Sequence, residues 1–99
     1  MSVRHLVLLR FQSTADEATR QRIVTDFAGL QTAIDGILAF ECGINQSPEN
    51  LHRGLDHIFL LTFRDAAARD AYLPHPAHQA FVASMQPWIE EVLVVDWRV

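Results

Sequence analysis

The chain has 99 residues, of which 49% are hydrophobic and 20% are charged, which is the composition of one ordinary globular domain. Its net charge of −4 at pH 7 does not favour nucleic acid or an anionic membrane surface as a partner. All eight basic residues are arginines, and the absence of lysine excludes chemistry through a lysine Schiff base.

Cys42 is the only cysteine, which excludes an internal disulfide and any multi-cysteine metal cluster. A single cysteine is typical of a reducing compartment, so we expect a cytoplasmic protein. The N-terminal apolar run is short and contains Arg4 and Arg10, so it predicts neither a signal peptide nor a membrane span.

The first third of the chain predicts a strand followed by a helix. Residues Arg4–Phe11 are apolar on both faces of a strand, which indicates that both faces are covered. Ser13–Asp35 predicts a helix, with Thr14 and Glu17 as a capping box and Gly36 as the C-terminal cap. The apolar stripe of this helix, which we expect to face a sheet, consists of Ile23, Phe27, Leu30 and Ile34.

Two further strands come next, joined by a long polar connection. Ile37–Asn45 predicts a less regular strand, in which Gly43 is expected to be a bulge or a weak point of the strand. After the connection Gln46–Leu55, the segment Asp56–Arg64 predicts a strand that is again largely apolar on both faces.

Two helices and a last strand complete the order. Asp65 is the expected cap of a helix over residues 66–73, which Pro74 and Pro76 interrupt. Pro76 suits the first turn of a second helix over residues 77–85, and Pro87 ends it. Trp88–Val99 then predicts a strand.

The order strand, helix, strand, strand, helix, strand predicts the α+β ferredoxin-like fold, an antiparallel four-stranded sheet in one domain over residues 1–99. Both helices cover the same face of such a sheet, so the other face is bare. We expect this bare face to pair two protomers into a dimeric α/β barrel. It carries Leu6, Leu8, Ile58, Leu60, Leu93 and Val95.

Four residues are candidates for chemistry. Strand parity places His5 and His57 on the face that packs against the helices, and His78 falls in the first turn of the helix after Pro76. A neutral imidazole at that place is suited to act as a general base, and Tyr72 lies just before the proline break. The alternative is structural: the histidines are hydrogen-bonded strand and helix ends, and Tyr72 is a packing aromatic.

We expect no metal site. His75 and His78 form an H-x-x-H pair, but Pro76 breaks the helical register that such a ligand pair needs. The chain also contains no glycine-rich phosphate loop and no dinucleotide-binding motif, so we expect no cofactor.

Five segments together carry a family resemblance: HLVLLRF, SPEN, GLDHIFLLTF, RDAYLPHPAHQAF and VLVVDW. They resemble the stress-responsive A/B barrel (Dabb) family over essentially the whole chain, and YLPHPAH is the most specific part. The resemblance implies a ferredoxin-like protomer that forms a homodimer through its sheets.

One plant type in this family, olivetolic acid cyclase, closes a linear polyketide thioester by an intramolecular aldol condensation without metal or cofactor. His5, His57, Tyr72 and His78 fall on the motif positions of its functional side chains. The resemblance therefore implies that His78 abstracts a proton, Tyr72 donates a hydrogen bond, and His5 and His57 position the substrate. We expect the apolar tail of a small hydrophobic or β-keto ligand to contact Val7, Leu9, Phe27, Phe59 and Trp88.

Three hypotheses for function stay open. The first is a cofactor-free cyclase or isomerase, which requires a pocket of about 300 Å³ or more with His78 and Tyr72 at its wall. The second is a non-catalytic, stress-responsive protein that binds or stabilises a ligand. The third, a cofactor-independent monooxygenase, rests on analogy of fold alone.

Overall fold

Strands and helices follow one another in the predicted order in the computed structural model, which describes all residues from Met1 to Val99. The elements are β1 (Val3–Phe11), α1 (Glu17–Ala33), β2 (Ile37–Ile44), β3 (His57–Phe63), α2 (Ala66–Tyr72), α3 (Pro76–Met85), a 3₁₀ turn (Gln86–Trp88) and β4 (Ile89–Arg98). No helix in the structure is long and apolar enough to cross a membrane.

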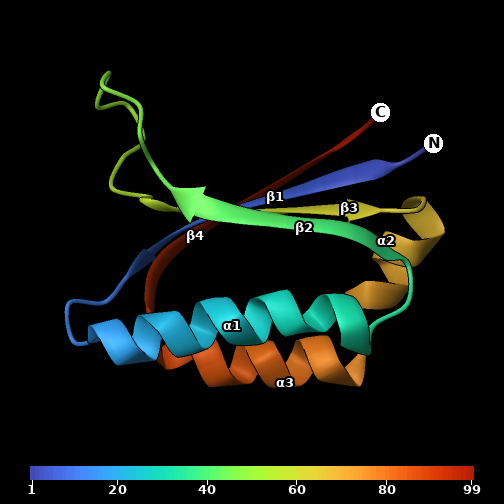
Figure 1. The fold of residues 1–99 in the computed structure, drawn as a ribbon, viewed down its shortest axis with the longest axis horizontal. Helices are drawn as coiled ribbons and strands as arrows, with labels where there is room; N and C mark the ends of the chain where they lie inside the picture. Colours follow the sequence, from blue (N-terminus) through green and yellow to red (C-terminus); the bar gives the residue numbers. More distant parts are fainter.

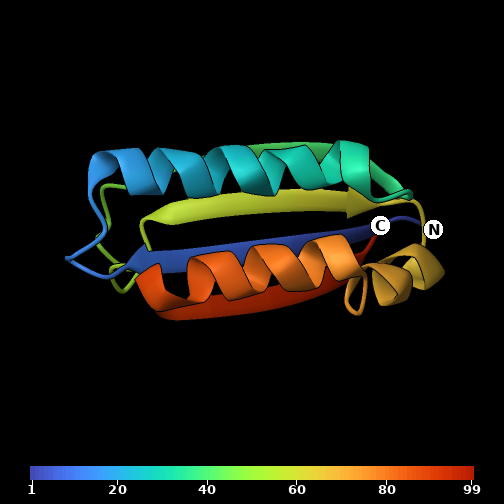
Figure 2. The same cartoon turned by 90° about the horizontal axis from the view of Figure 1, so that it is seen from below.

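The sheet has the order β2-β3-β1-β4, and every neighbouring pair of strands is antiparallel. All helices lie on one side of it, so the sheet has a covered face and an open face (Figure 1). Seen from the helical side, α1 runs over the half of the sheet that contains β2 and β3, and α3 runs over β1 and β4 (Figure 2). This is the predicted ferredoxin-like arrangement.

The core lies between the sheet and the helices. Alternate residues of β1, from Val3 to Phe11, are buried, and so are Phe59, Leu61 and Phe63 of β3. The predicted stripe of the first helix supplies the opposite side, since its members are at most 5% exposed: Ile23, Phe27, Leu30 and Ile34. Strand parity therefore identified the buried face of both central strands.

The open face carries the predicted apolar residues. Leu6 pairs with Leu60 and Leu8 with Ile58, and on the other side the same two leucines pair with Val95 and Leu93. Directly paired residues of antiparallel strands lie on one face, so these side chains form a continuous apolar surface. Leu93 and Val95 are 42% and 46% exposed in the protomer.

The first helix begins later than the sequence suggested. Residues 13 and 14 form a turn, in which Ala15 N–H donates to the Gln12 carbonyl, and the helix starts at Glu17. Its N-cap is Asp16, whose side chain accepts the Thr19 N–H at 2.8 Å. The predicted Thr14–Glu17 capping box is wrong, because the ionised carboxylate two residues on is the stronger acceptor for the same helix end.

The bulge in β2 also lies elsewhere than expected. Gly43 pairs regularly with Ile58, whereas the register shifts between Ile37 and Ala39. The extra residue is Leu38, two residues after the turn at Gly36, and it is 57% exposed. A bulge at the start of the strand lets the chain leave the helix layer and join the sheet at its edge.

The N-cap of α1 gives a first test. Asp16→Ala removes the acceptor of the Thr19 N–H, so we expect a lower melting temperature, whereas Thr14→Ala should leave it unchanged. Hydrogen bonds from Thr19 lower the pKa of Asp16, so the cap stabilises the fold above the ordinary aspartate pKa and is lost as the pH falls through the lowered value. Thermal unfolding at neutral and acid pH measures both effects, and equal melting temperatures for the two variants would contradict this assignment.

Candidate functional site

An apolar pocket of about 230 Å³ lies between α2, α3 and the β1–β4 half of the sheet. Three polar side chains reach it, those of His5, Tyr72 and His78. The rest of the wall is apolar: Val7, Phe27, Leu73, Phe81, Val82, Met85, Val92 and Val94. The structure thus brings together three of the four residues that the sequence singled out.

Tyr72, the last residue of α2, is the most deeply buried of the three, with no exposed surface. Its ring lies between those of Phe63 and His78, at centroid distances of 4.9 and 4.2 Å, and it meets His5 edge-on at 5.8 Å. The Tyr72 hydroxyl is buried without a hydrogen-bond partner. Burial raises the pKa of this phenol well above its usual range, so at neutral pH it is a donor that lacks an acceptor.

The proline break explains why His78 meets Tyr72. Pro76 is the first residue of α3, and His75 caps that helix by accepting the Ala77 N–H at 3.0 Å. His78 therefore sits in the first turn, where its Nδ1 lies 3.0 Å from the Leu73 carbonyl oxygen. A carbonyl only accepts, so Nδ1 carries the proton and Nε2 is the basic nitrogen.

His5 enters the pocket from the start of β1, and it is 5% exposed. Its Nδ1 lies 2.7 Å from Oδ1 of Asp96, on the neighbouring strand β4. The other carboxylate oxygen of Asp96 accepts from Nη1 of Arg69 at 2.6 Å. A chain of polar contacts therefore runs from α2 through β4 to the wall of the pocket.

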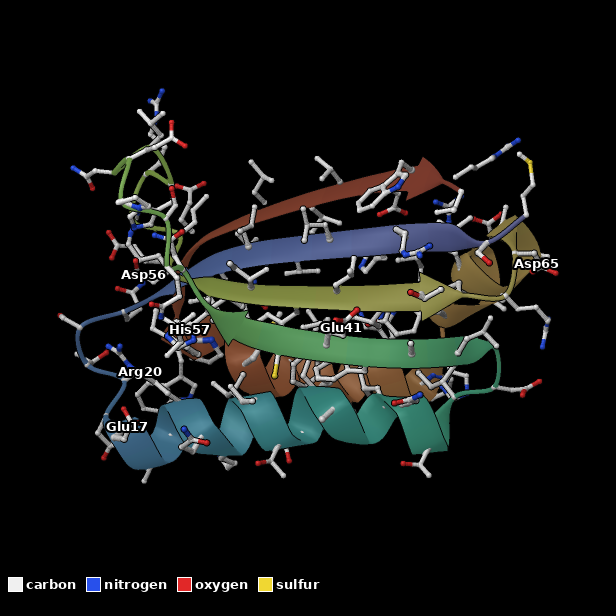
Figure 3. The ribbon with its side chains drawn as sticks, turned by 45° about the horizontal axis from the view of Figure 1, so that its top comes forward. Glu17, Arg20, Glu41, Asp56, His57 and Asp65 are labelled. Carbon is white, nitrogen blue, oxygen red and sulfur yellow. The ribbon has the colours of Figure 1, made fainter.

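His57 does not share this pocket, which corrects the expectation of a four-residue site. It lines a separate hollow of about 120 Å³ together with Gln21, Val24, Cys42, Gly43, Ile44 and Phe59. Its ring meets Phe11 edge-on at 4.8 Å. Burial, assisted by the charge of Arg20, lowers the pKa of His57. Figure 3 shows His57 beside Arg20 and Asp56 at one end of the sheet, far from Asp65, which precedes α2.

The strand register gives the reason for the separation. His57 pairs with Leu9, whereas His5 pairs with Leu61. Four residues of strand, about 13 Å, therefore separate the positions of the two histidines along the sheet. Strand parity placed both on the covered face but carried no information about their distance.

The predicted tail-binding residues divide in the same way. Val7 and Phe27 line the pocket, whereas Leu9, Phe59 and Trp88 do not. Phe27 stacks on Phe59 at 4.6 Å and packs against Phe81 at 4.7 Å. These rings fill the middle of the layer between helices and sheet, which is why the pocket is smaller than the 300 Å³ or more that we expected.

The structure contains no group of three or more His, Cys, Asp or Glu side chains that is placed to hold a metal ion. In the H-x-x-H pair, Nδ1 of His75 accepts the Ala77 N–H, and Nδ1 of His78 faces the Leu73 carbonyl. The absence of a metal requirement stays a prediction, which elemental analysis of the purified protein would check.

The partners of His5 were not predicted from the sequence. Asp96 lies directly opposite His5 in the β1–β4 ladder, and Arg69 reaches it from α2. A carboxylate inside the apolar strand VLVVDW was the available signal, because such a group needs a partner when it is buried.

Comparison with known proteins agrees with the resemblance seen in the sequence. Residues 3–99 match the profile of the family described as the stress responsive A/B barrel domain. The chain belongs to this family. It is 33% identical to the stress-response A/B barrel domain-containing protein HS1 of Arabidopsis thaliana, over 97% of this chain and 88% of that protein. It is 27% identical to olivetolic acid cyclase of Cannabis sativa, over 98% of this chain and 96% of the cyclase.

One similar solved structure is described as a dimer. A protein from Jannaschia sp. CCS1, described as a dimeric ferredoxin-like protein of unknown function, is 32% identical to this chain. The match covers 100% of both chains with a TM-score of 0.82. The stress responsive A/B barrel fold of the chain is therefore one whose relatives include dimers.

Because the Tyr72 hydroxyl has no hydrogen-bond partner, substitution of Tyr72 shows whether this hydroxyl stabilises the fold. Tyr72→Phe keeps the ring and removes a buried donor without a partner, so we expect the free energy of unfolding to change by less than about 1 kcal/mol. Tyr72→Ala also removes the ring, which should cost about 3–5 kcal/mol. Urea unfolding of both variants measures the difference. If Tyr72→Phe costs as much as Tyr72→Ala, the hydroxyl is structural.

Proposed function

We propose that this protein binds a small β-keto or phenolic molecule in the pocket between α3 and β4, and performs cofactor-free acid–base chemistry of the cyclase or isomerase type on it. The observation that carries the proposal is the Tyr72 hydroxyl, which is buried and unpaired, on a ring whose centroid lies 4.2 Å from that of His78. An unsatisfied buried hydroxyl costs about 1–3 kcal/mol, and a ligand oxygen in the pocket would offset that cost.

The roles of His78 and Tyr72 follow from which of their atoms carries a proton. Nε2 of His78 takes the acidic proton of a carbon between two carbonyl groups, because Nδ1 is engaged with Leu73. Tyr72 donates its hydroxyl hydrogen bond to the enolate oxygen that this step creates. In a cyclase, the enolate carbon then bonds to a second carbonyl carbon, and the imidazolium of His78 returns the proton to the resulting alkoxide.

The volume of the pocket limits the substrate. At about 230 Å³ the pocket itself accommodates a short molecule, and a longer apolar tail would extend into the adjoining hollow of about 310 Å³, which shares Val82, Met85 and Val92 with it. The likeness to olivetolic acid cyclase supports the type of chemistry.

The carbonyl chemistry assigned to His78 is testable. With a short 3-ketoacyl thioester in D₂O, we expect the protein to accelerate exchange of the α-protons. His78→Ala should reduce the catalysed rate by roughly 10²–10⁴-fold, the usual contribution of a general base. Proton NMR of the α-position follows the exchange.

A matched control separates this effect from the general loss of a histidine. His52 lies in the connection between β2 and β3, where it pairs with Asp56 at 2.8 Å, and His52→Gln should leave the rate unchanged. Equal losses in both variants, or no protein-dependent exchange in the wild type, would refute the enzymatic proposal.

A non-catalytic ligand-binding protein is the second candidate, and the small pocket favours it. It predicts that short aryl ketones raise the melting temperature of the wild type by mass action, while α-proton exchange stays at the rate of buffer alone. The thermal shift and the exchange assay together distinguish the two functions.

We also propose that two protomers pair through their open sheet faces. The face is apolar across β1, β3 and β4, and a protomer alone leaves it in water. A dimer that buries this surface gains the hydrophobic stabilisation that a thin domain of 99 residues lacks.

Leu8→Asp tests the dimer. It places a carboxylate in the middle of the proposed interface, where an unpaired buried charge is costly, so we expect a monomer of half the wild-type mass. Ala18→Asp adds the same charge in the first turn of α1, where a negative group is tolerated, and should stay dimeric. Size-exclusion chromatography with light scattering gives the masses, and a monomeric wild type at micromolar concentration would contradict the proposal.

A further inference from the structure

The side chains of Asp96, Arg69 and Asp70 form a network of hydrogen bonds that ends at His5. His5 and Asp96 are direct partners in the β1–β4 ladder, and their side chains meet at 2.7 Å. Arg69 holds the second oxygen of Asp96 at 2.6 Å, and its Nε contacts Asp70 at 2.8 Å. The carboxylate is therefore fixed from both sides, by a strand neighbour and by a helix.

The direction of these hydrogen bonds fixes the proton on His5. An ionised carboxylate accepts only and a guanidinium donates only, so Nδ1 of His5 must donate to Asp96. In the neutral ring the lone pair is then on Nε2, for which the structure provides no hydrogen-bond partner. His5 is one of the residues that line the pocket, and within the protein its Nε2 is an acceptor without a donor.

We infer that Asp96 is a positioning residue that holds His5 with Nε2 as an acceptor for the pocket, and that the pocket takes a ligand carrying a hydroxyl group for His5 and a carbonyl oxygen for Tyr72. This inference rests on the proposed function and names its ligand class, which is a hydroxylated ketone in phenol or enol form. Neither Asp96 nor Arg69 touches the ligand, and both act through His5.

Two unpaired polar groups of opposite kind support this ligand class. Tyr72 is a buried donor without an acceptor, and His5 is an acceptor without a donor. Their rings are 5.8 Å apart in an edge-on arrangement. The remaining wall is mostly apolar, so a ligand that fails to satisfy both groups leaves a buried polar atom unpaired.

Asp96→Asn should reverse the polarity of His5. Arg69 can only donate, so the Asn amide must turn its oxygen toward Arg69 and its NH₂ toward His5. Nδ1 of His5 then accepts, and the proton moves to Nε2, which becomes a donor. Asp70→Asn is the matched control, because it makes the same chemical change on another carboxylate that contacts Arg69.

Nitrogen-15 NMR of the histidine rings reads the tautomer directly. In the wild type and in Asp70→Asn, we expect His5 with a protonated Nδ1 and a pyridine-like Nε2; in Asp96→Asn, the two nitrogens should exchange character. A pyridine-like Nδ1 in the wild type would overturn the inference, as would an unchanged tautomer in Asp96→Asn. The wild-type measurement decides the assignment even if Asp96→Asn does not fold.

Ligand binding tests the second half of the inference. The probes are 3-hydroxyacetophenone and 3-methoxyacetophenone, of which only the first has a hydroxyl donor. Comparison of their affinity ratio between proteins cancels the difference in size. We expect Asp96→Asn to reduce the preference for the hydroxyl compound by about two- to tenfold, the value of one hydrogen bond, and Asp70→Asn to leave it unchanged.

The outcomes separate this inference from the proposed function. Failure of the proposed function shows as normal α-proton exchange in His78→Ala, which leaves the His5 tautomer unaffected. If the tautomer changes but the ligand preference does not, or if neither acetophenone binds the wild type, the assigned ligand class is wrong.

Discussion

A four-stranded sheet has two faces to bury, and in this protein the helices cover only one of them (Figure 1). The covered face takes the aromatic core, the fully buried Tyr72 and the pocket beside α3. The open face has no helix over it and stays apolar, with Leu93 and Val95 more than 40% exposed. The candidate site and the proposed dimer surface therefore lie on opposite faces of β1 and β4, and a side chain's parity on these strands decides which of the two it belongs to.

Aromatic packing decides the size of the site. The stack of Phe27 on Phe59, with Phe81 against it, occupies the centre of the layer between α1 and the sheet. It leaves one hollow at the Tyr72 end and a smaller one at the His57 end. The same rings that supply much of the hydrophobic stabilisation thus separate two histidines that parity alone had placed together.

Parity and turn chemistry were sufficient to predict the fold, the buried stripe of α1 and the proline break that presents His78 to Tyr72. The N-cap, the bulge and the contacts between distant strands were not predictable in this way, because they depend on competing hydrogen-bond acceptors or on how the strands pair. Asp16 and not Thr14 is the cap, because a carboxylate accepts more strongly, and the bulge lies at Leu38, near the start of β2, and not at Gly43. The contact of His5 with Asp96 required the β1–β4 register, which lies between residues far apart in the sequence.

The polar groups of the pocket, on His5, Tyr72 and His78, form no hydrogen bonds with one another, as they would in a purely structural core. Asp96 satisfies one side of His5 and Leu73 satisfies one side of His78, and in both rings the engaged atom is Nδ1. In its neutral form each histidine thereby keeps Nε2 as an acceptor, while Tyr72 keeps its proton as a donor because burial raises the pKa of its phenol. These polarities are fixed before any ligand arrives, so a bound molecule meets oriented groups and need not reorganise them. Such preorganisation in an apolar surrounding is the condition under which a few hydrogen bonds can stabilise a developing enolate.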